Sequence, residues 1–193
     1  MNEAQADVPG LAPEQREYLR ELARAVITAA VTGRQPPSAR KLAAARGLEL
    51  GPALLDERGA FVTLHRTGRL RGCIGYIEGV KPVVEAVADN ARGAALYDPR
   101  FPAVQEAELS DLQIEISVLS PLRPVAGPQD IVLGEHGIML SKGSARAVFL
   151  PQVAVEQGWD LHTTLGHLAL KAGLGPAGWQ DGTRFSVFTA DIF

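Results

Sequence analysis

The chain has 193 residues, of which 46% are hydrophobic and 21% charged, and its formal net charge is −3. This profile is that of a globular protein and excludes a wholly disordered chain. The negative balance argues against a nucleic-acid-binding protein, because phosphate binding depends on clustered Lys and Arg. No apolar run approaches the roughly 18 to 20 residues of a membrane span, and the polar start lacks a signal-peptide pattern. We therefore expect a cytoplasmic protein without a membrane partner.

The cysteine content limits the use of metals and cofactors. The single cysteine cannot form an internal disulfide, and the four histidines lack the spacing of a zinc module. The sequence also lacks a Gly-rich phosphate loop, a Gly-x-Ser-x-Gly elbow and a paired-histidine motif. We expect no metal and no cofactor, so that stability comes from packing.

The first half of the chain predicts two helices followed by a hairpin. Apolar residues at helical spacing indicate a helix over residues 13–33, and a serine cap indicates a shorter helix over 38–46. Strand-like runs over 61–65 and 70–77 are separated by Thr67 and Gly68. This pattern predicts an antiparallel hairpin.

The second half mixes strands with separated helices. A helix is expected after Pro82, and alternating residues predict a strand over 113–119 with one face in the core. The remaining expected elements are a hairpin over 137–140 and 145–150, a helix over 161–172 and a strand over 185–193. Without regular β-α alternation, the order favours an α+β fold with mostly antiparallel sheet, flanking helices and two unequal lobes.

Cys73 lies on the second strand of the predicted hairpin, between Gly72 and Gly75. Glycines leave the backbone open to a ligand, and Arg71 on the same predicted face is a cation that favours the thiolate. The alternative is structural, because free cysteine is among the most buried residue types and glycines also mark bulges. These residues alone leave both interpretations open.

Candidate bases for this thiol are distant in the sequence. If Thr67 and Gly68 form the turn, His65 faces Leu70 and Val62 faces Cys73, which places His65 on the opposite face of the sheet. The other three histidines are expected in exposed or capping roles, although the fold could bring one to the thiol.

Two further pairs of residues are candidates for the site. Glu115 and Ser117 share the polar face of their strand, where a carboxylate and a hydroxyl can orient a substrate or carry a proton. Asp98 and Arg100 lie in a proline-rich turn and can clamp a ligand. A solvated sheet face and a self-bonded turn are the structural alternatives.

The run from Leu70 to Gly75 resembles the signature of the AMMECR domain family, whose prokaryotic members are called AmmeMemoRadiSam system protein A. Four further blocks are similar in wording and order: residues 98–102, 114–121, 150–153 and 171–174. The resemblance covers about residues 13–193 as one domain and leaves residues 1–12 as a flexible tail. It implies a two-lobed α+β fold in which the cysteine segment lies close to a cleft between the lobes.

The resemblance also implies a functional setting. The system name implies association with a Memo-like protein and a radical S-adenosylmethionine enzyme in a modification pathway. Ala169 stands where a second cysteine often appears in the family, which disfavours a mechanism with two thiols. Tyr76 stands where a smaller polar residue is common.

Together these observations predict an enzyme or enzyme subunit that uses a cysteine nucleophile. The predicted catalytic residues are Cys73, Arg71 and Glu115. The predicted substrate contacts are Gly72, Gly75, Asp98, Arg100, Ser117 and Gln152. The alternative is a non-catalytic adaptor that docks a partner protein through Tyr97, Arg100 and Phe101.

Overall fold

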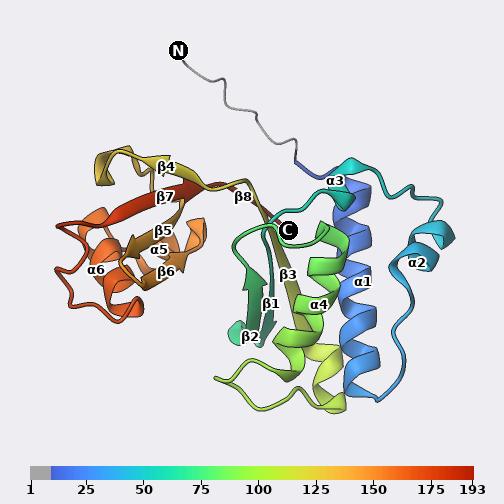
Figure 1. Ribbon diagram of the computed structural model, residues 1–193. Helices are drawn as coiled ribbons and strands as arrows, with labels where there is room; N and C mark the ends of the chain where they lie inside the picture. Colours follow the sequence, from blue (N-terminus) through green and yellow to red (C-terminus); the bar gives the residue numbers. More distant parts are fainter. Residues whose placement is uncertain (1–9) are drawn as a thin grey trace. The chain divides into compact units, whose positions relative to one another are not determined.

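The computed structural model describes residues 10–193, which form two compact units (Figure 1). The first unit comprises the chain up to Leu119 together with Asp191–Phe193, and the second comprises Ser120–Ala190. Each unit contains a four-stranded sheet whose described strand pairs are antiparallel. The predicted α+β class is confirmed.

The three longest helices of the first unit lie close to where the sequence predicts them. Pro13 occupies the first turn of α1, where its missing N–H costs no hydrogen bond. Ser38 caps α2 by accepting from the Lys41 N–H at 3.2 Å. The helical elements are α1 (Pro13–Val31), α2 (Ala39–Ala45), α3 (Pro52–Leu55), α4 (Val83–Leu96) and the 3-10 helix η1 (Glu106–Asp111).

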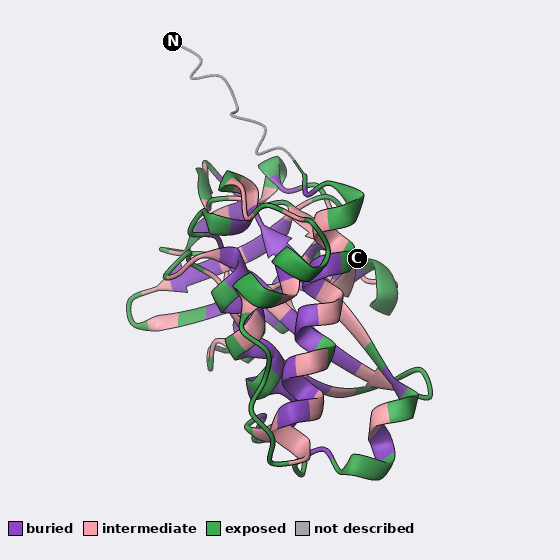
Figure 2. Cartoon of the chain, turned by 90° about the vertical axis from the view of Figure 1, so that its right-hand side faces the viewer, coloured by how far each residue is buried: buried purple, intermediate pink, exposed green. Residues whose placement is uncertain are grey.

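The sheet of the first unit has the order β2-β1-β3-β8. Its strands are β1 (Ala60–Arg66), β2 (Arg69–Tyr76), β3 (Leu112–Leu119) and β8 (Ala190–Ile192). Helices α1 and α4 cover one face, against which Val62, Leu64 and Ile116 are fully buried (Figure 1). Figure 2 shows buried and exposed positions interspersed along the helices, and in α1 and α4 the buried residues recur at helical spacing, as packing on one side requires.

The β1–β2 hairpin contains a bulge that changes its register. Thr67 and Gly68 both have positive φ, 50° and 74°, the combination that a two-residue hairpin turn needs. His65 faces Leu70, as predicted, but the next pair joins Leu64 to Gly72 and skips Arg71. The skipped residue shifts the remaining register by one. Cys73 therefore faces Thr63, and the predicted pairing with Val62 is wrong.

The second unit packs two helices beside a sheet of order β4-β7-β5-β6. Its core includes Leu140, Leu165, Leu168 and Phe185. Asp160 caps the second of these helices by accepting from the Thr163 N–H at 2.8 Å. The elements are β4 (Arg123–Val125), the 3-10 helix η2 (Pro128–Asp130), β5 (Gly137–Lys142), β6 (Ala145–Phe149), α5 (Pro151–Gln157), α6 (Leu161–Lys171) and β7 (Arg184–Phe188).

The packed chain starts before the first helix. Leu11 is buried, and its N–H donates to Asp191 Oδ2 at 2.8 Å. The earlier part of the predicted tail, residues 1–9, lies outside the described residues. In the part of the chain that the structure describes, no helix is both long and apolar enough to cross a membrane.

Candidate functional site

Cys73 lies on β2, the outer strand of the first sheet, and on the face that α1 and α4 do not cover. Residues directly opposite each other in neighbouring strands point to the same face of a sheet. Cys73 faces Thr63, and Thr63 faces Glu115, so the three residues form one row across β2, β1 and β3. We call this face the Cys73 face.

The thiol of Cys73 is held by a hydroxyl. Thr63 Oγ1 donates to Cys73 Sγ at 3.3 Å. The two side chains come close because the backbone N–H and C=O of Cys73 point away from β1, which makes this a non-hydrogen-bonded pair of the ladder, the kind with the shorter separation. Thr63 is buried, whereas Cys73 is half-buried and not part of a disulfide.

Asp98 and Arg100 hold the backbone of Cys73 from the outer edge of β2. The Cys73 N–H donates to Asp98 Oδ2 at 2.8 Å, and Arg100 Nη2 donates to the Cys73 carbonyl at 3.3 Å. Arg100 also donates to both carboxylate oxygens of Asp98, at 2.9 and 2.7 Å. We call these two residues the clamp.

The clamp has one buried and one exposed member. The side chain of Asp98 is 2% exposed, and that of Arg100 is 55% exposed. Hydrogen bonds from Arg100, and then from the N–H groups of Cys73 and Arg100, hold the pKa of Asp98 well below its ordinary range. Asp98 in turn raises the pKa of Arg100. The turn therefore carries a fixed ion pair beside Cys73.

Arg71, the bulge residue, is held by a different carboxylate. Its Nε and Nη2 donate to the two oxygens of Glu108 at 2.9 Å each, and its Nη1 donates to the Pro102 carbonyl at 2.8 Å. Arg66 also donates to Glu108 at 2.9 Å. Arg71, with help from the Gln105 N–H and Arg66, lowers the pKa of Glu108 to about 2. The cation in contact with Cys73 is Arg100, and Arg71 has a partner that the sequence did not predict.

Gly72 and Gly75 have packing roles. A Cβ on Gly72 would overlap the backbone carbonyl of Ala94 in α4, so this glycine lets the helix approach the strand. A Cβ on Gly75 would overlap the ring of Phe61 on the Cys73 face. The open space predicted around these glycines is occupied by the protein itself, and their substrate contacts stay a prediction.

Of the remaining predicted site residues, two lie on the Cys73 face. Glu115 is half-buried at the β3 end of the row. Ser117, one row further along β3, is 1% exposed, and its hydroxyl has no hydrogen-bond partner among the described residues. Gln152 lies on α5, in the second unit. The cleft and the substrate contact of Gln152 stay predictions.

Three of the four histidines have local contacts. His136 Nδ1 accepts from the Val132 N–H at 3.1 Å. His167 stacks on Trp159 with ring centroids 4.0 Å apart, and His162 meets the ring of Trp179 edge-on. All these contacts lie within the second unit.

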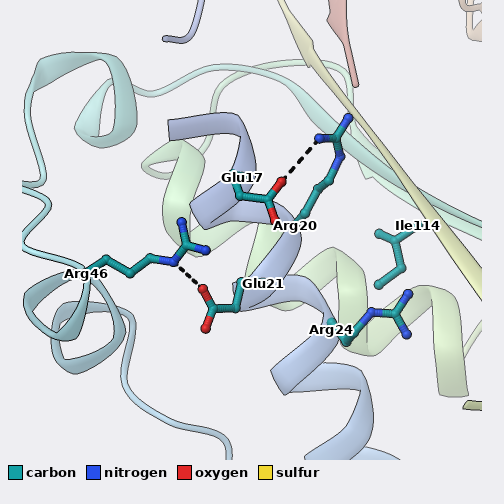
Figure 3. Close-up of a pocket in the computed structure, with 6 residues that line it drawn as sticks. All are labelled: Glu17, Arg20, Glu21, Arg24, Arg46 and Ile114. Carbon is teal, nitrogen blue, oxygen red and sulfur yellow. Dashed lines mark hydrogen bonds and ion pairs between the residues drawn. The ribbon is translucent and has the colours of Figure 1, made fainter. Parts of the chain in front are cut away.

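A cavity of about 300 Å³ lies elsewhere, beside α1 (Figure 3). Arg46 pairs with Glu21, and Arg20 lies 3.5 Å from Glu17. Both Nη atoms of Arg24 donate to backbone carbonyls, those of Leu109 and Leu112. The lining residues are Glu17, Arg20, Glu21, Arg24, Arg46 and Ile114. Because its charges are already paired and it contains no predicted site residue, this cavity is not our candidate site.

Among residues 10–193, no group of three or more His, Cys, Asp or Glu side chains is placed to hold an ion. The chemistry available on the Cys73 face is that of a thiol, a hydroxyl, a carboxylate and a guanidinium.

The site is thus that of an α+β protein with one cysteine, fixed by a hydroxyl and a clamp, on an edge strand. The AMMECR1 family model matches residues 20–193, and the chain belongs to this family. A protein of Methanothermobacter thermautotrophicus is 45% identical over 152 residues, which cover 75% of this chain and 79% of the relative. A protein of Methanopyrus kandleri is 38% identical over 195 residues, with coverage of 93% and 88%.

The fold of the chain also matches a solved structure. The crystal structure of the uncharacterized protein PH0010 from Pyrococcus horikoshii is similar with a TM-score of 0.79 and 37% identity. The match covers 91% of this chain and 89% of that one. The predicted family resemblance is confirmed.

Sequence reasoning missed two residues of the site. The pairing of Thr63 with Cys73 could have been predicted from the strand register only if the bulge at Arg71 had been known. Glu108 lies 37 residues beyond Arg71, in η1, and nothing in the local pattern marks it as a partner.

Proposed function

We propose that this AMMECR1-family chain is an enzyme or enzyme subunit in which Cys73 is the nucleophile. The observation that supports this most directly is the hydrogen bond from Thr63 Oγ1 to Cys73 Sγ at 3.3 Å, on a half-buried thiol. A nucleophile must be held in one position and remain accessible. The Thr63 hydroxyl holds the thiol in position, and the partial exposure of Cys73 keeps it accessible.

The clamp strengthens this proposal. It fixes both the N–H and the C=O of Cys73, which limits the movement of the strand under the thiol. The half-exposed guanidinium of Arg100 remains available to a carboxylate or carbonyl oxygen of a substrate. In this function Arg100 takes the role first assigned to Arg71, as the cation beside the nucleophile.

Glu115 is the proposed proton carrier. It lies two strands from Cys73, and neighbouring strands are about 4.8 Å apart, so the two backbones are separated by roughly 10 Å. At that separation Glu115 serves a group of the bound substrate instead of the thiol itself. The thiolate then supplies the electron pair of the new bond to sulfur, and the leaving group takes the pair of the bond that breaks.

The sequence resemblance adds the setting of the proposal. We place the reaction in the cytoplasm, in a modification pathway shared with a Memo-like protein and a radical S-adenosylmethionine enzyme. Substrate contacts from Gly72, Gly75, Asp98, Ser117 and Gln152 belong to the same proposal.

The rate of Cys73 alkylation tests the nucleophile. Native protein is treated with iodoacetamide between pH 6 and 10, and the adduct on Cys73 is followed by mass spectrometry. We expect modification of the folded protein at neutral pH. A thiol that reacts only in strongly alkaline solution or after denaturation would contradict the proposal, and loss of the fold in Cys73→Ser would assign the cysteine to packing.

One surface favours a second function, a non-catalytic adaptor. Tyr97 is 62% exposed, with the Arg92 guanidinium 5.8 Å from its ring centroid, and Arg100 lies 5.4 Å from the ring centroid of Phe101. Aromatic and arginine side chains are enriched at protein interfaces. In co-purification from native cells, the adaptor function requires that Phe101→Ala or Arg100→Ala removes the partner while Cys73→Ala retains it.

A further inference from the structure

The outer edge of β2 presents backbone groups that do not pair with another strand. In an antiparallel ladder, alternate residues turn their N–H and C=O toward the partner strand and away from it. Those of Cys73 point away from β1, toward the clamp. Two residues further on, Gly75 therefore presents its N–H and C=O to the same outer side.

The protein covers only part of this edge. The clamp occupies the backbone groups of Cys73, and the same loop continues to Pro102, whose carbonyl accepts from Arg71. Within residues 10–193, no hydrogen bond to Gly75 is found outside the β1–β2 ladder. The loop thus blocks the edge at Cys73 and toward the start of β2, and Gly75 is left open.

Two exposed side chains with apolar surface lie close in the sequence to β2 and to the clamp. Val80 follows the end of β2 and is 58% exposed, and Tyr97, next to the clamp, is 62% exposed. An open edge with apolar neighbours is the feature by which proteins bind an extended peptide as an added strand.

We propose that the substrate of the Cys73 site is an extended polypeptide segment that pairs with the backbone of Gly75 as an added strand. This rests on the proposed function. In an extended peptide, the N–H and the C=O of one residue can pair with the C=O and the N–H of Gly75. The side chain of that residue then points to the Cys73 face, where it is the diagonal neighbour of Cys73, about 7–8 Å away between Cα atoms. The thiolate supplies the electron pair of a new bond to an electrophilic carbon of this side chain, and the leaving group on that carbon departs with the electron pair of the bond that breaks.

The clamp gives the added strand a limited length. Asp98 and Arg100 stand where the strand would pass Cys73, so the peptide leaves the edge there. The edge can therefore bind the peptide backbone at only one residue pair, helped by the nearby apolar side chains. Such a site would select a substrate by its extended conformation and would read little of its amino-acid sequence.

Electrophilic peptides test the proposal on the full chain. The probe is acetyl-Lys-Val-Xaa-Val-Lys-amide, in which Xaa is diaminopropionate carrying a chloroacetyl group. One control carries an N-methyl group on Xaa, and a second carries it on the following Val, whose N–H points away from β2 when Xaa pairs with Gly75. Free chloroacetamide reports the intrinsic reactivity of Cys73, and adducts are quantified by mass spectrometry.

We expect the probe and the Val-methylated control to label Cys73 about tenfold faster than the Xaa-methylated control, which lacks one backbone hydrogen bond. Equal rates for all three peptides, with chloroacetamide reactive, would overturn the peptide proposal and leave the nucleophile in place. A thiol inert to chloroacetamide would overturn both.

Hydrogen exchange gives a readout that does not depend on the thiol. The same peptide with Ala at Xaa is added to the Cys73→Ser variant, and exchange of the Gly75 amide is followed by NMR. We expect this amide to be slowed by the peptide and not by its Xaa-methylated form. Unchanged exchange at saturating peptide would contradict the added strand.

Discussion

The two faces of the β2-β1-β3 sheet differ in chemistry although the same strands form both. On the face that the helices cover, Val62, Leu64 and Ile116 are fully buried aliphatic residues. On the Cys73 face, the intervening positions of the same strands carry Thr63 and Glu115. Because successive side chains point to opposite faces, one strand contributes alternately to the core and to the candidate site. Substitutions on the two faces should therefore affect different properties.

The largest expected effect is a loss of core packing on the helix-covered face. Leu64→Ala removes a fully buried side chain, and we expect the free energy of unfolding to fall by about 2–5 kcal/mol. Urea denaturation followed by circular dichroism measures it. Leu70→Ala is the matched control, because Leu70 is 40% exposed, and we expect a change within about 0.5 kcal/mol. Similar losses of stability in the two variants would contradict the difference between the buried core position and the exposed position.

The next effect concerns the carboxylate that holds the bulge. Glu108→Gln removes a charge that pairs with Arg71 and Arg66, and we expect a loss of about 1–3 kcal/mol at pH 7. Since folding lowers the pKa of Glu108 from 4.5 to about 2, its contribution is complete above pH 4.5 and is lost as the pH falls toward 2.

Acid titration of stability checks this sign. The difference between wild type and Glu108→Gln should shrink between pH 6 and pH 3. Glu106→Gln, an exposed position in the same 3-10 helix, should give no comparable difference. If the stability difference between wild type and Glu108→Gln stays constant with pH, the paired carboxylate is not its cause.

A smaller effect is expected at the clamp. Asp98→Asn keeps an acceptor for the Cys73 N–H but loses the charge that pairs with Arg100, and we expect a loss of about 1 kcal/mol at pH 7. Since folding depresses the pKa of Asp98, this contribution is present above its ordinary value of 3.8 and is lost below it. Asp89→Asn, at an exposed ion pair, is the control and should change stability less. An unchanged alkylation rate at Cys73 in Asp98→Asn would argue against the clamp as a positioning device.

The smallest effect on stability is expected on the Cys73 face itself. Thr63→Val keeps the shape and removes the hydrogen bond to Sγ, so the stability should change by less than about 1 kcal/mol. The rate of Cys73 alkylation should nevertheless change, while Thr63→Ser retains the hydroxyl and stays close to wild type. If Val and Ser variants react alike, the hydroxyl does not serve the thiol.

Much of the fold could be predicted because its signals are local. The apolar spacing in α1, the Ser38 cap of α2 and the turn at Thr67 and Gly68 each depend on residues close in the sequence. The elements that were missed are short. The sequence predicts no helix at α3 or at α5, and both begin at a proline. A proline marks both a turn and a first helical residue, so its presence alone does not separate them.

The details of the site were harder to predict because they depend on non-local geometry. One bulge residue, Arg71, moved the partner of Cys73 from Val62 to Thr63. The partner of Arg71 lies in another element. It is Glu108, which is buried and also pairs with a second arginine, Arg66. The self-bonded turn considered for Asp98 and Arg100 is present, since both residues are close in the sequence. The contact of Asp98 with Cys73 joins residues 25 positions apart, so it could be found only from the folded structure.

The terminal strand predicted over 185–193 is divided between two sheets. It forms β7 in the second unit, and after Thr189 the chain enters β8 in the first. The Phe193 N–H donates to the Ile116 carbonyl at 3.0 Å, and the Ile116 N–H donates back at 2.8 Å. During synthesis on the ribosome, the first unit therefore has a sheet in which the edge of β3 that faces away from β1 is unpaired until the whole second unit has been translated. Its last step of assembly is delayed by 71 residues, from Ser120 to Ala190, and that interval is when the unfinished edge is open to chaperones.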